Sequence, residues 1–150
     1  MDIMIHSDNA TTAGNQQERL DPWWIVGFAD GEGCFSVSTF RNHTCTSGYQ
    51  TLYEFVFTQG ESSRQAMEAI KDYFGCGYVY INRRHDNHRE NLLRYCVRKQ
   101  EDLRTKIIPF FRQYALQSAK KKQFERFCSL LLGQESSETI RRSPAKRDKI

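Results

Sequence analysis

The chain has 150 residues, of which 22 are Lys or Arg and 18 are Asp or Glu, so its formal net charge is +4. This length suffices for one domain with a hydrophobic core. The five cysteines form no C-x-x-C pair and are odd in number, so they predict neither a zinc site nor a disulfide framework. No apolar run approaches the roughly 20 residues that span a membrane, and the polar N-terminus does not resemble a signal peptide. We therefore expect an intracellular protein, in the cytoplasm or nucleoid or in an organelle that carries its own genome.

Residues 1–19 are polar and lack periodicity, so we expect a disordered arm. The first ordered element is an apolar helix that begins after Asp21, which can cap it, and Pro22, which suits its first turn. The residues that follow are apolar nearly all round, which predicts burial on both sides. Gly27 and Gly31 lie one turn apart on one face and leave a shallow groove where another backbone can approach closely.

Glu32 stands at the C-terminal end of this helix, where the helix dipole disfavours a carboxylate. A helix end that carries a carboxylate and free carbonyls is complemented by a hard divalent cation. If two such helices pack side by side, two Glu32 carboxylates meet at one end. That arrangement could hold the metals of a site that cleaves phosphodiesters.

The rest of the chain alternates pairs of strands with helices. The predicted strands span residues 34–42, 50–59, 78–84 and 92–99. The predicted later helices span 62–74, 101–111 with an interruption at Pro109, and about 118–132, which Gly133 ends. We expect an α+β fold of the order αββαββα, with a curved antiparallel four-stranded sheet packed on helices. Residues 20–133 form the domain, and 134–150 a basic flexible tail.

The alternation of side chains along these strands assigns two faces to the sheet. The face that covers the core is predicted to carry Phe35, Val37, Tyr53, Phe55, Phe57, Val79, Ile81, Tyr95 and Val97. The opposite face is predicted to carry Ser36, Ser38, Phe40, Asn42, Gln50, Glu54, Tyr80, Asn82, Arg84, Arg94 and Arg98. Such a surface can lie in the major groove of DNA, where Arg reads guanine and Asn or Gln reads adenine. The alternative is an ordinary solvent-facing side of an antiparallel sheet.

Basic residues gather between Arg83 and Lys99 and again at Lys120–Lys122. Clusters of this kind supply the salt-sensitive attraction to phosphates that is common in DNA-binding proteins. The alternative for each cluster is a solvated surface.

The residues from Ile25 to Gly33 match the LAGLIDADG motif position by position, and a strand-like run starts directly after them. The chain therefore resembles the LAGLIDADG family, which consists mainly of homing endonucleases with some intron maturases. Only one motif occurs here, as in the homodimeric members, which bind a long and nearly palindromic DNA site. The resemblance implies that the motif helices form the two-fold interface. The interface residues would be Trp24, Gly27, Phe28 and Gly31.

The resemblance also implies a set of catalytic residues. Glu32 and the Gly31 carbonyl would bind Mg²⁺ or another divalent cation such as Mn²⁺, although Asp is commoner than Glu at this place in the family. Gln59 would position an ordered water, and Lys120 would activate that water or stabilise charge on the phosphate. An Arg after the second strand would act similarly; Arg64 is nearest, and Ser63 is the alternative. Asp30 is expected to cap or brace the motif helix.

The function expected from these residues is metal-dependent, site-specific double-strand cleavage of a long pseudo-palindromic DNA. Water would attack the phosphorus directly, because no Ser-His or Cys-His constellation offers a nucleophile. Two alternatives remain: a maturase that binds intron RNA, and a non-cleaving DNA-binding regulator of the same fold.

Overall fold

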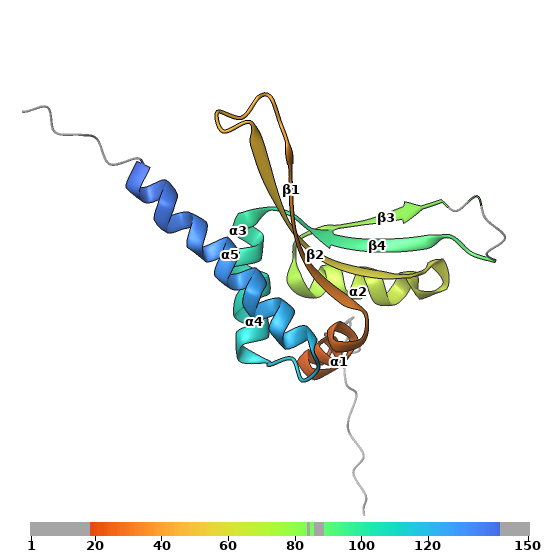
Figure 1. Ribbon diagram of the computed structural model, residues 1–150. Helices are drawn as coiled ribbons and strands as arrows, with labels where there is room; N and C mark the ends of the chain where they lie inside the picture. Colours follow the sequence, from red (N-terminus) through yellow and green to blue (C-terminus); the bar gives the residue numbers. More distant parts are fainter. Residues whose placement is uncertain (1–18, 84, 86–88, 142–150) are drawn as a thin grey trace, which may run out of the picture.

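The computed structural model describes residues 19–83, 85 and 89–141 of the chain (Figure 1). The first half comprises α1 (Pro22–Glu32), β1 (Gly33–Arg41), β2 (Tyr49–Gly60), the short turn η1 (Glu61–Ser63) and α2 (Arg64–Phe74). The second half comprises β3 (Tyr78–Asn82), β4 (Leu92–Val97), α3 (Gln100–Asp102), η2 (Leu103–Ile107), α4 (Ile108–Gln113) and α5 (Lys120–Arg141). The α+β class and the predicted order of the elements are confirmed. No helix among these residues is long and apolar enough to cross a bilayer.

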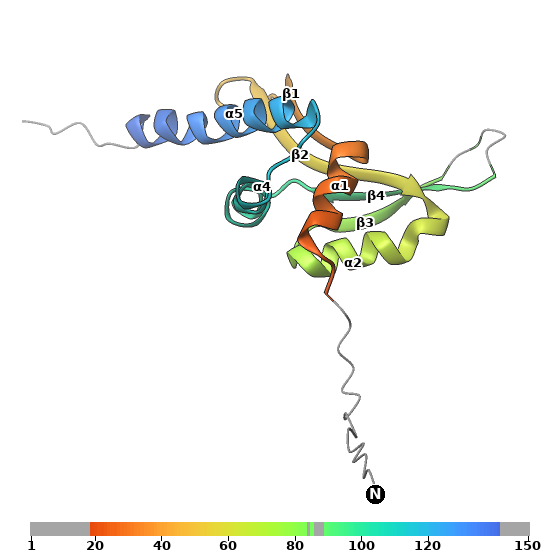
Figure 2. The same cartoon turned by 90° about the horizontal axis from the view of Figure 1, so that it is seen from below.

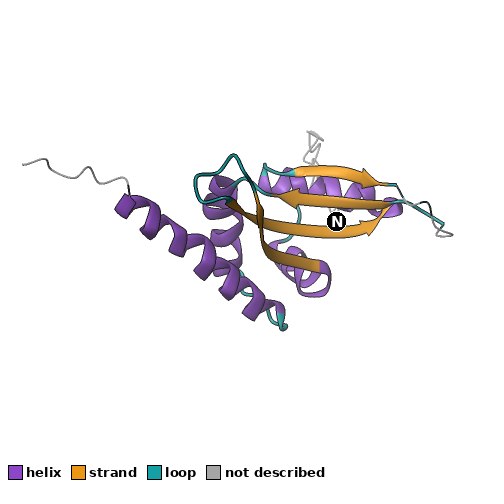
Figure 3. Ribbon diagram, turned by 45° about the horizontal axis from the view of Figure 1, so that its top comes forward, coloured by secondary structure: helices purple, strands orange, loops and turns teal. Residues whose placement is uncertain are grey.

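The four strands form one antiparallel sheet in the order β1-β2-β4-β3. Along β2, only the second half, from Phe55 to Gly60, pairs with β4. The first half of β2 pairs with β1 alone, so the β1–β2 hairpin extends beyond the other strands (Figure 1). Helices α1 and α2 lie against one face (Figure 2), and the opposite face has no covering helix (Figure 3). The fold therefore leaves a long, twisted and uncovered surface.

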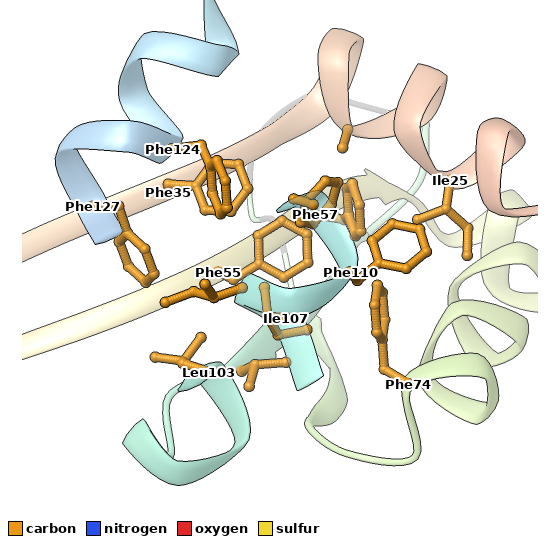
Figure 4. Packing of buried hydrophobic residues seen from close by; sticks show 14 of the residues in the cluster. Ile25, Phe35, Phe55, Phe57, Phe74, Leu103, Ile107, Phe110, Phe124 and Phe127 are labelled. Carbon is orange, nitrogen blue, oxygen red and sulfur yellow. The ribbon is translucent and has the colours of Figure 1, made fainter. Parts of the chain in front are cut away.

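An aromatic cluster fills the space between the sheet and the helices (Figure 4). Phe55 is fully buried, and its ring contacts those of Phe35 at 4.8 Å, Phe57 at 4.9 Å and Phe111 at 5.3 Å between centroids. These separations are typical of favourable aromatic pairs. The predicted core face is thus confirmed at its centre. Val37, at the middle of β1, and Ile81, next to the end of β3, are instead 36% and 40% exposed.

The helix around Pro109 is not broken as the sequence suggested, because helical turns run without a gap from Gln100 to Gln113. The segment just before this proline, η2, is a π-helix. A proline lacks the backbone N–H and clashes with the carbonyl four residues earlier, here Thr105. The wider π turn accommodates that carbonyl without ending the helix.

The prediction that Gly133 ends the last helix is wrong, because α5 continues to Arg141. Among the described glycines only Gly48, Gly75 and Gly77 have positive φ, so Gly133 does not adopt the left-handed conformation of a helix stop. Gly75, with φ of 65°, does end α2 as predicted. Residues 134–141 of the predicted tail are helical, whereas 142–150 lie outside the described residues, as do 1–18 of the predicted arm.

Phe55→Ala tests whether this aromatic cluster stabilises the fold. The variant should lower the free energy of unfolding by about 3–5 kcal/mol, because it removes a fully buried ring and leaves a cavity. Urea denaturation followed by circular dichroism would measure the loss. Phe40→Ala is the control, since Phe40 is 45% exposed on the uncovered face. Equal losses in the two variants would contradict this assignment of the core.

Candidate active site and nucleic-acid interface

Helix α1 is anchored to the core on one side only. Asp21 caps it by accepting from the Trp23 backbone N–H at 2.8 Å, and Ile25, Val26 and Ala29 are buried. The predicted burial of both sides is therefore not met within one chain. Trp24 is 44% exposed and its ring stacks on Phe28 at 5.2 Å between centroids.

The two glycines of α1 belong to this uncovered side. A Cβ added at Gly27 or at Gly31 would meet no atom within 4 Å, so nothing within the chain requires glycine at either position. Of the four predicted interface residues, Trp24, Gly27 and Gly31 are exposed, whereas Phe28 is half-buried and its ring lies 4.9 Å from that of Phe57 between centroids. We call Trp24, Gly27, Phe28 and Gly31 the α1 outer face.

The chain passes from α1 into β1 without a linker. Gly33, the first residue of β1, donates its N–H to the Ala29 carbonyl, and a Cβ here would lie 2.7 Å from that oxygen. Gly33 is therefore required by close packing. It pairs with Phe57, so Glu32, one residue before it, lies at the same end of the hairpin as Gln59, two residues after Phe57. Glu32 is exposed and Gln59 is half-buried.

Asp30 ties the end of α1 to the start of α5. Its carboxylate accepts from the backbone N–H of Gln117 at 3.0 Å and of Ser118 at 2.9 Å, and the Ser118 hydroxyl donates to the Asp30 carbonyl at 3.3 Å. Burial acts to raise the pKa of Asp30, but these hydrogen bonds outweigh it and hold that pKa below its usual value. Asp30 therefore braces the motif helix, as predicted, and holds it against α5.

This tie also fixes the position of Lys120, the first residue of α5. Its backbone N–H donates to the Ser118 hydroxyl at 3.2 Å, and the residue is half-buried. Lys121 instead lines a separate groove with Phe124 and Glu125, and Lys122 is exposed. The Lys121 backbone N–H also donates to Ser118, to its carbonyl at 3.0 Å, so Lys120 differs from the other two lysines in being half-buried.

Arg64 is the first residue of α2, and its guanidinium forms an ion pair with Glu61 at 3.3 Å. Ser63 precedes it and makes no side-chain cap for the helix. Both follow directly from the end of β2 that carries Gln59. The fold therefore brings Arg64 and Ser63 to this end of the sheet but does not choose between them.

The uncovered face of the sheet carries most of the polar residues predicted for it. Cross-strand pairs align Ser36 with Glu54 and Ser38 with Leu52, and Tyr80 with Arg94. Among the predicted residues, Ser38, Phe40, Gln50, Asn82 and Arg98 are exposed. Ser36, Tyr80 and Arg94 are partly exposed.

Two members of the predicted face are placed differently, and a third is not described. Asn42 follows the end of β1, where its side-chain amide donates to Gln50 at 2.7 Å and its oxygen accepts from Thr44, so it closes the hairpin loop. Glu54 is only 7% exposed and is paired with Arg94 of β4 and with Arg98, which follows β4. Arg84 lies outside the described residues.

The profile of the family described as LAGLIDADG endonuclease matches residues 25–131. The chain belongs to this family. A protein in ND4 intron 1 of Podospora anserina is 32% identical to this LAGLIDADG chain over 117 residues, which are 77% of the chain and 24% of that relative. Other curated relatives are named as probable intron-encoded endonucleases. The chain spans 20% to 37% of the length of the curated relatives that it matches.

Solved structures show the same LAGLIDADG fold. The homing endonuclease I-TnaI is 39% identical, with a TM-score of 0.71 over 79% of this chain and 76% of its own. The I-SmaMI LAGLIDADG homing endonuclease, solved bound to cleaved DNA, is 30% identical, with a TM-score of 0.70 over 79% of this chain and 38% of its own. The predicted family and fold class are therefore confirmed.

The donor chemistry at the end of α1 fits a divalent cation shared with another molecule. No group of three or more His, Cys, Asp and Glu side chains gathers within the described part of this LAGLIDADG chain. Glu32 offers an exposed carboxylate, and among the described residues none forms a hydrogen bond or ion pair with it. Carboxylate, backbone carbonyl and phosphate oxygens are the ligands that Mg²⁺ prefers. A second copy of the chain and a phosphate would complete such a set.

The hydrogen bonds to the Asp30 carboxylate predict that the free energy of unfolding depends on pH. Because its folded-state pKa is depressed, the carboxylate stabilises the fold above its usual value of 3.8, and this contribution is lost as pH falls through the folded pKa. Asp30→Ala should lower the free energy of unfolding by about 0.5–2 kcal/mol at neutral pH, with a difference from the natural chain that shrinks in acid. Denaturation series at several pH values would measure this, with Asp30→Asn, which keeps an acceptor, as control. A difference independent of pH would contradict it.

Proposed function

We propose that the chain is a metal-dependent, site-specific DNA endonuclease that acts as a symmetric dimer. The observation that carries this proposal is the exposed Glu32, without a partner among the described residues, at the end of a helix that exposes Trp24, Gly27 and Gly31. Membership of the LAGLIDADG endonuclease family and the names of its relatives support the same reaction. We expect it inside the cell, in the compartment that holds its target DNA.

The α1 outer face suits a second copy of itself. Trp24 and Phe28 offer stacked apolar surface, and Gly27 and Gly31 allow the two helix backbones to approach closely. A two-fold axis between the helices makes the same patch serve on both chains. The two Glu32 residues, each at the C-terminal end of its α1, then lie beside the axis.

Each residue of the proposed site has one part in the hydrolysis of the phosphodiester bond. Glu32, with the Gly31 carbonyl, would hold Mg²⁺ or Mn²⁺. When bound, the metal lowers the pKa of a coordinated water and stabilises charge on the phosphate oxygens. Gln59 orients the water that attacks phosphorus, and the 3′ oxygen of the DNA strand leaves.

Cationic side chains complete the proposed site. Lys120, held by the tie between Asp30 and Ser118, places its ammonium beside the charge that develops on the phosphate. Arg64 assists from the start of α2, if its pair with Glu61 opens.

The uncovered face of the sheet is the proposed DNA-binding surface. Two copies related by the two-fold axis would contact two half-sites, which accounts for a pseudo-palindromic target. Phosphate contacts supply affinity, and side chains on the strands supply base selection. The alternatives, intron RNA as the ligand and DNA binding without cleavage, remain predictions; the exposed carboxylate of Glu32 favours cleavage.

Glu32→Gln separates binding from cutting. The variant should lose at least about 100-fold in cleavage rate, because an amide is a poor ligand for a divalent cation, while it still binds DNA. Linearisation of a plasmid that carries the uninterrupted host junction would report cleavage, and a gel-shift assay would report binding. EDTA should abolish cleavage by the natural chain. Unchanged cleavage by Glu32→Gln would overturn the assignment of Glu32, and binding without cleavage by the natural chain would favour the alternatives.

Gly27→Leu tests the dimer. Within one chain the new side chain has open space, so the variant should fold and unfold like the natural protein. Between two α1 helices it should prevent close packing, so sedimentation should show monomers and cleavage should be lost. Gly133→Leu, which also has open space but lies on α5, is the matched control and should leave the dimer intact. A dimer of unchanged affinity in Gly27→Leu would contradict the proposed interface.

A further inference from the structure

The uncovered face of the sheet contains one side chain that does not suit direct contact with DNA. Glu54 lies near the middle of β2 on this face, and it is the only charged residue that is buried in the described part of the chain. An anion here faces the proposed site of a polyanion. The contacts of its two oxygens show what it does instead.

Both carboxylate oxygens of Glu54 accept from residues of β4 or from Arg98, which directly follows β4. Arg94 donates through Nη2 to Oε1 at 3.2 Å, and Arg98 donates through Nε to Oε2 at 2.5 Å. The Cys96 thiol, between the two arginines on the same face, donates to Oε2 at 3.3 Å. The acid is therefore shared by three alternate residues, Arg94 and Cys96 in β4 and Arg98 directly after it.

Glu54 stays charged in this setting. Burial acts to raise its pKa, but donation from Arg98 and Cys96 and the positive charges of Arg98 and Arg94 outweigh it and lower the pKa. Burial also raises the pKa of the Cys96 thiol, which keeps its proton and remains a donor. If Glu54 turned outward to accept from a base, it would leave these donors unpaired, and breaking such a buried pair is strongly unfavourable.

The register explains why two apolar residues of the same face are buried. The row of Val56 and Cys96 lies between the row of Glu54 and the row that pairs Thr58 with Arg94. Arg94 must cross that middle row to reach Glu54, and Val56 and Cys96 are only 4% and 3% exposed. The arginine stem thus lies over a small apolar platform, which restricts where its guanidinium can go.

The hydrogen bond between Arg98 and Glu54 uses Nε of the guanidinium, a nitrogen that is not needed for the recognition of guanine. Nε is occupied by Glu54, which leaves the two terminal nitrogens of a planar fork. These two donors are the pair that can meet O6 and N7 of guanine in the major groove. Nη2 of Arg98 also lies 3.5 Å from the Tyr80 hydroxyl, so the fork is held on two sides while its side chain is 51% exposed.

We propose that Glu54 is a positioning residue for target selection: it holds Arg98 in the orientation that reads guanine. The inference rests on the proposed function. An arginine held in advance loses less conformational freedom on binding than a free one, so its preference for the correct base is larger. The negative charge of the same carboxylate also offsets one positive charge on the uncovered face of the sheet, which weakens the sequence-independent attraction of this face to DNA phosphates.

Glu54→Gln tests the proposal in the full-length chain. Randomised DNA duplexes would be selected with the natural protein, and base preference at each position of the recovered site would be compared among variants. Arg98→Lys, which keeps the charge but loses the fork, identifies the position that Arg98 reads. At that position the preference for guanine should fall from about 10-fold or more to about 2-fold or less in Glu54→Gln. Affinity for unrelated DNA should rise.

Glu125→Gln is the matched control, because it makes the same chemical change at an exposed residue of α5, away from the sheet. It should keep the preference for guanine. Thermal melting would confirm that Glu54→Gln folds; if it does not, Glu54→Asp, which keeps the charge but shortens the reach, should show the same loss of preference. An unchanged preference in the folded Glu54 variant would overturn the inference. Failure of the natural protein to select any sequence would overturn the proposed function and this inference with it.

Discussion

The hydrogen bonds from Gln117 and Ser118 to Asp30 are the constraint on which the rest of the site depends. They join the end of α1 to the start of α5, two elements that are far apart in the sequence. Without this join, the position of Lys120 relative to Glu32 would depend on an irregular segment that follows α4. A carboxylate that accepts from consecutive backbone N–H groups is a strong and directional link. The motif helix is thus held from within the chain before any partner binds.

Local patterns predicted much of this fold. The cap at Asp21, the alternation through Phe55 and Phe57, and the glycine stop at Gly75 depend on neighbours within a few residues, so their physical causes are visible in the sequence. For the exposed side of α1, the sequence predicted burial but not the surface that would cover it. Its apolar composition indicated burial, but a single sequence does not state whether the covering surface belongs to the same chain or to another.

The role of Glu54 was not predicted, because it depends on contacts between distant segments. Glu54 reads as one more polar residue in an alternating strand, and only the register of β2 against β4 shows that Arg94 and Arg98 enclose it. The π turn before Pro109 and the continuation of α5 past Gly133 have a local cause instead, because the helix backbone accommodates both residues. A helix breaker has a modest cost of about 1 kcal/mol for glycine, which the surrounding turns can outweigh.

The direct passage from α1 into β1 at Gly33 would have a consequence for the spacing of two cuts made by the proposed dimer. Because no linker separates α1 from the sheet, the position of each strand relative to the proposed two-fold axis would follow from the distance between the two α1 helices. In the proposed dimer, the residues at positions 27 and 31, both glycine, would set the distance between the two helices. Their size would set how many base pairs lie between the two broken phosphodiester bonds, and so the length of the single-stranded ends that cleavage leaves.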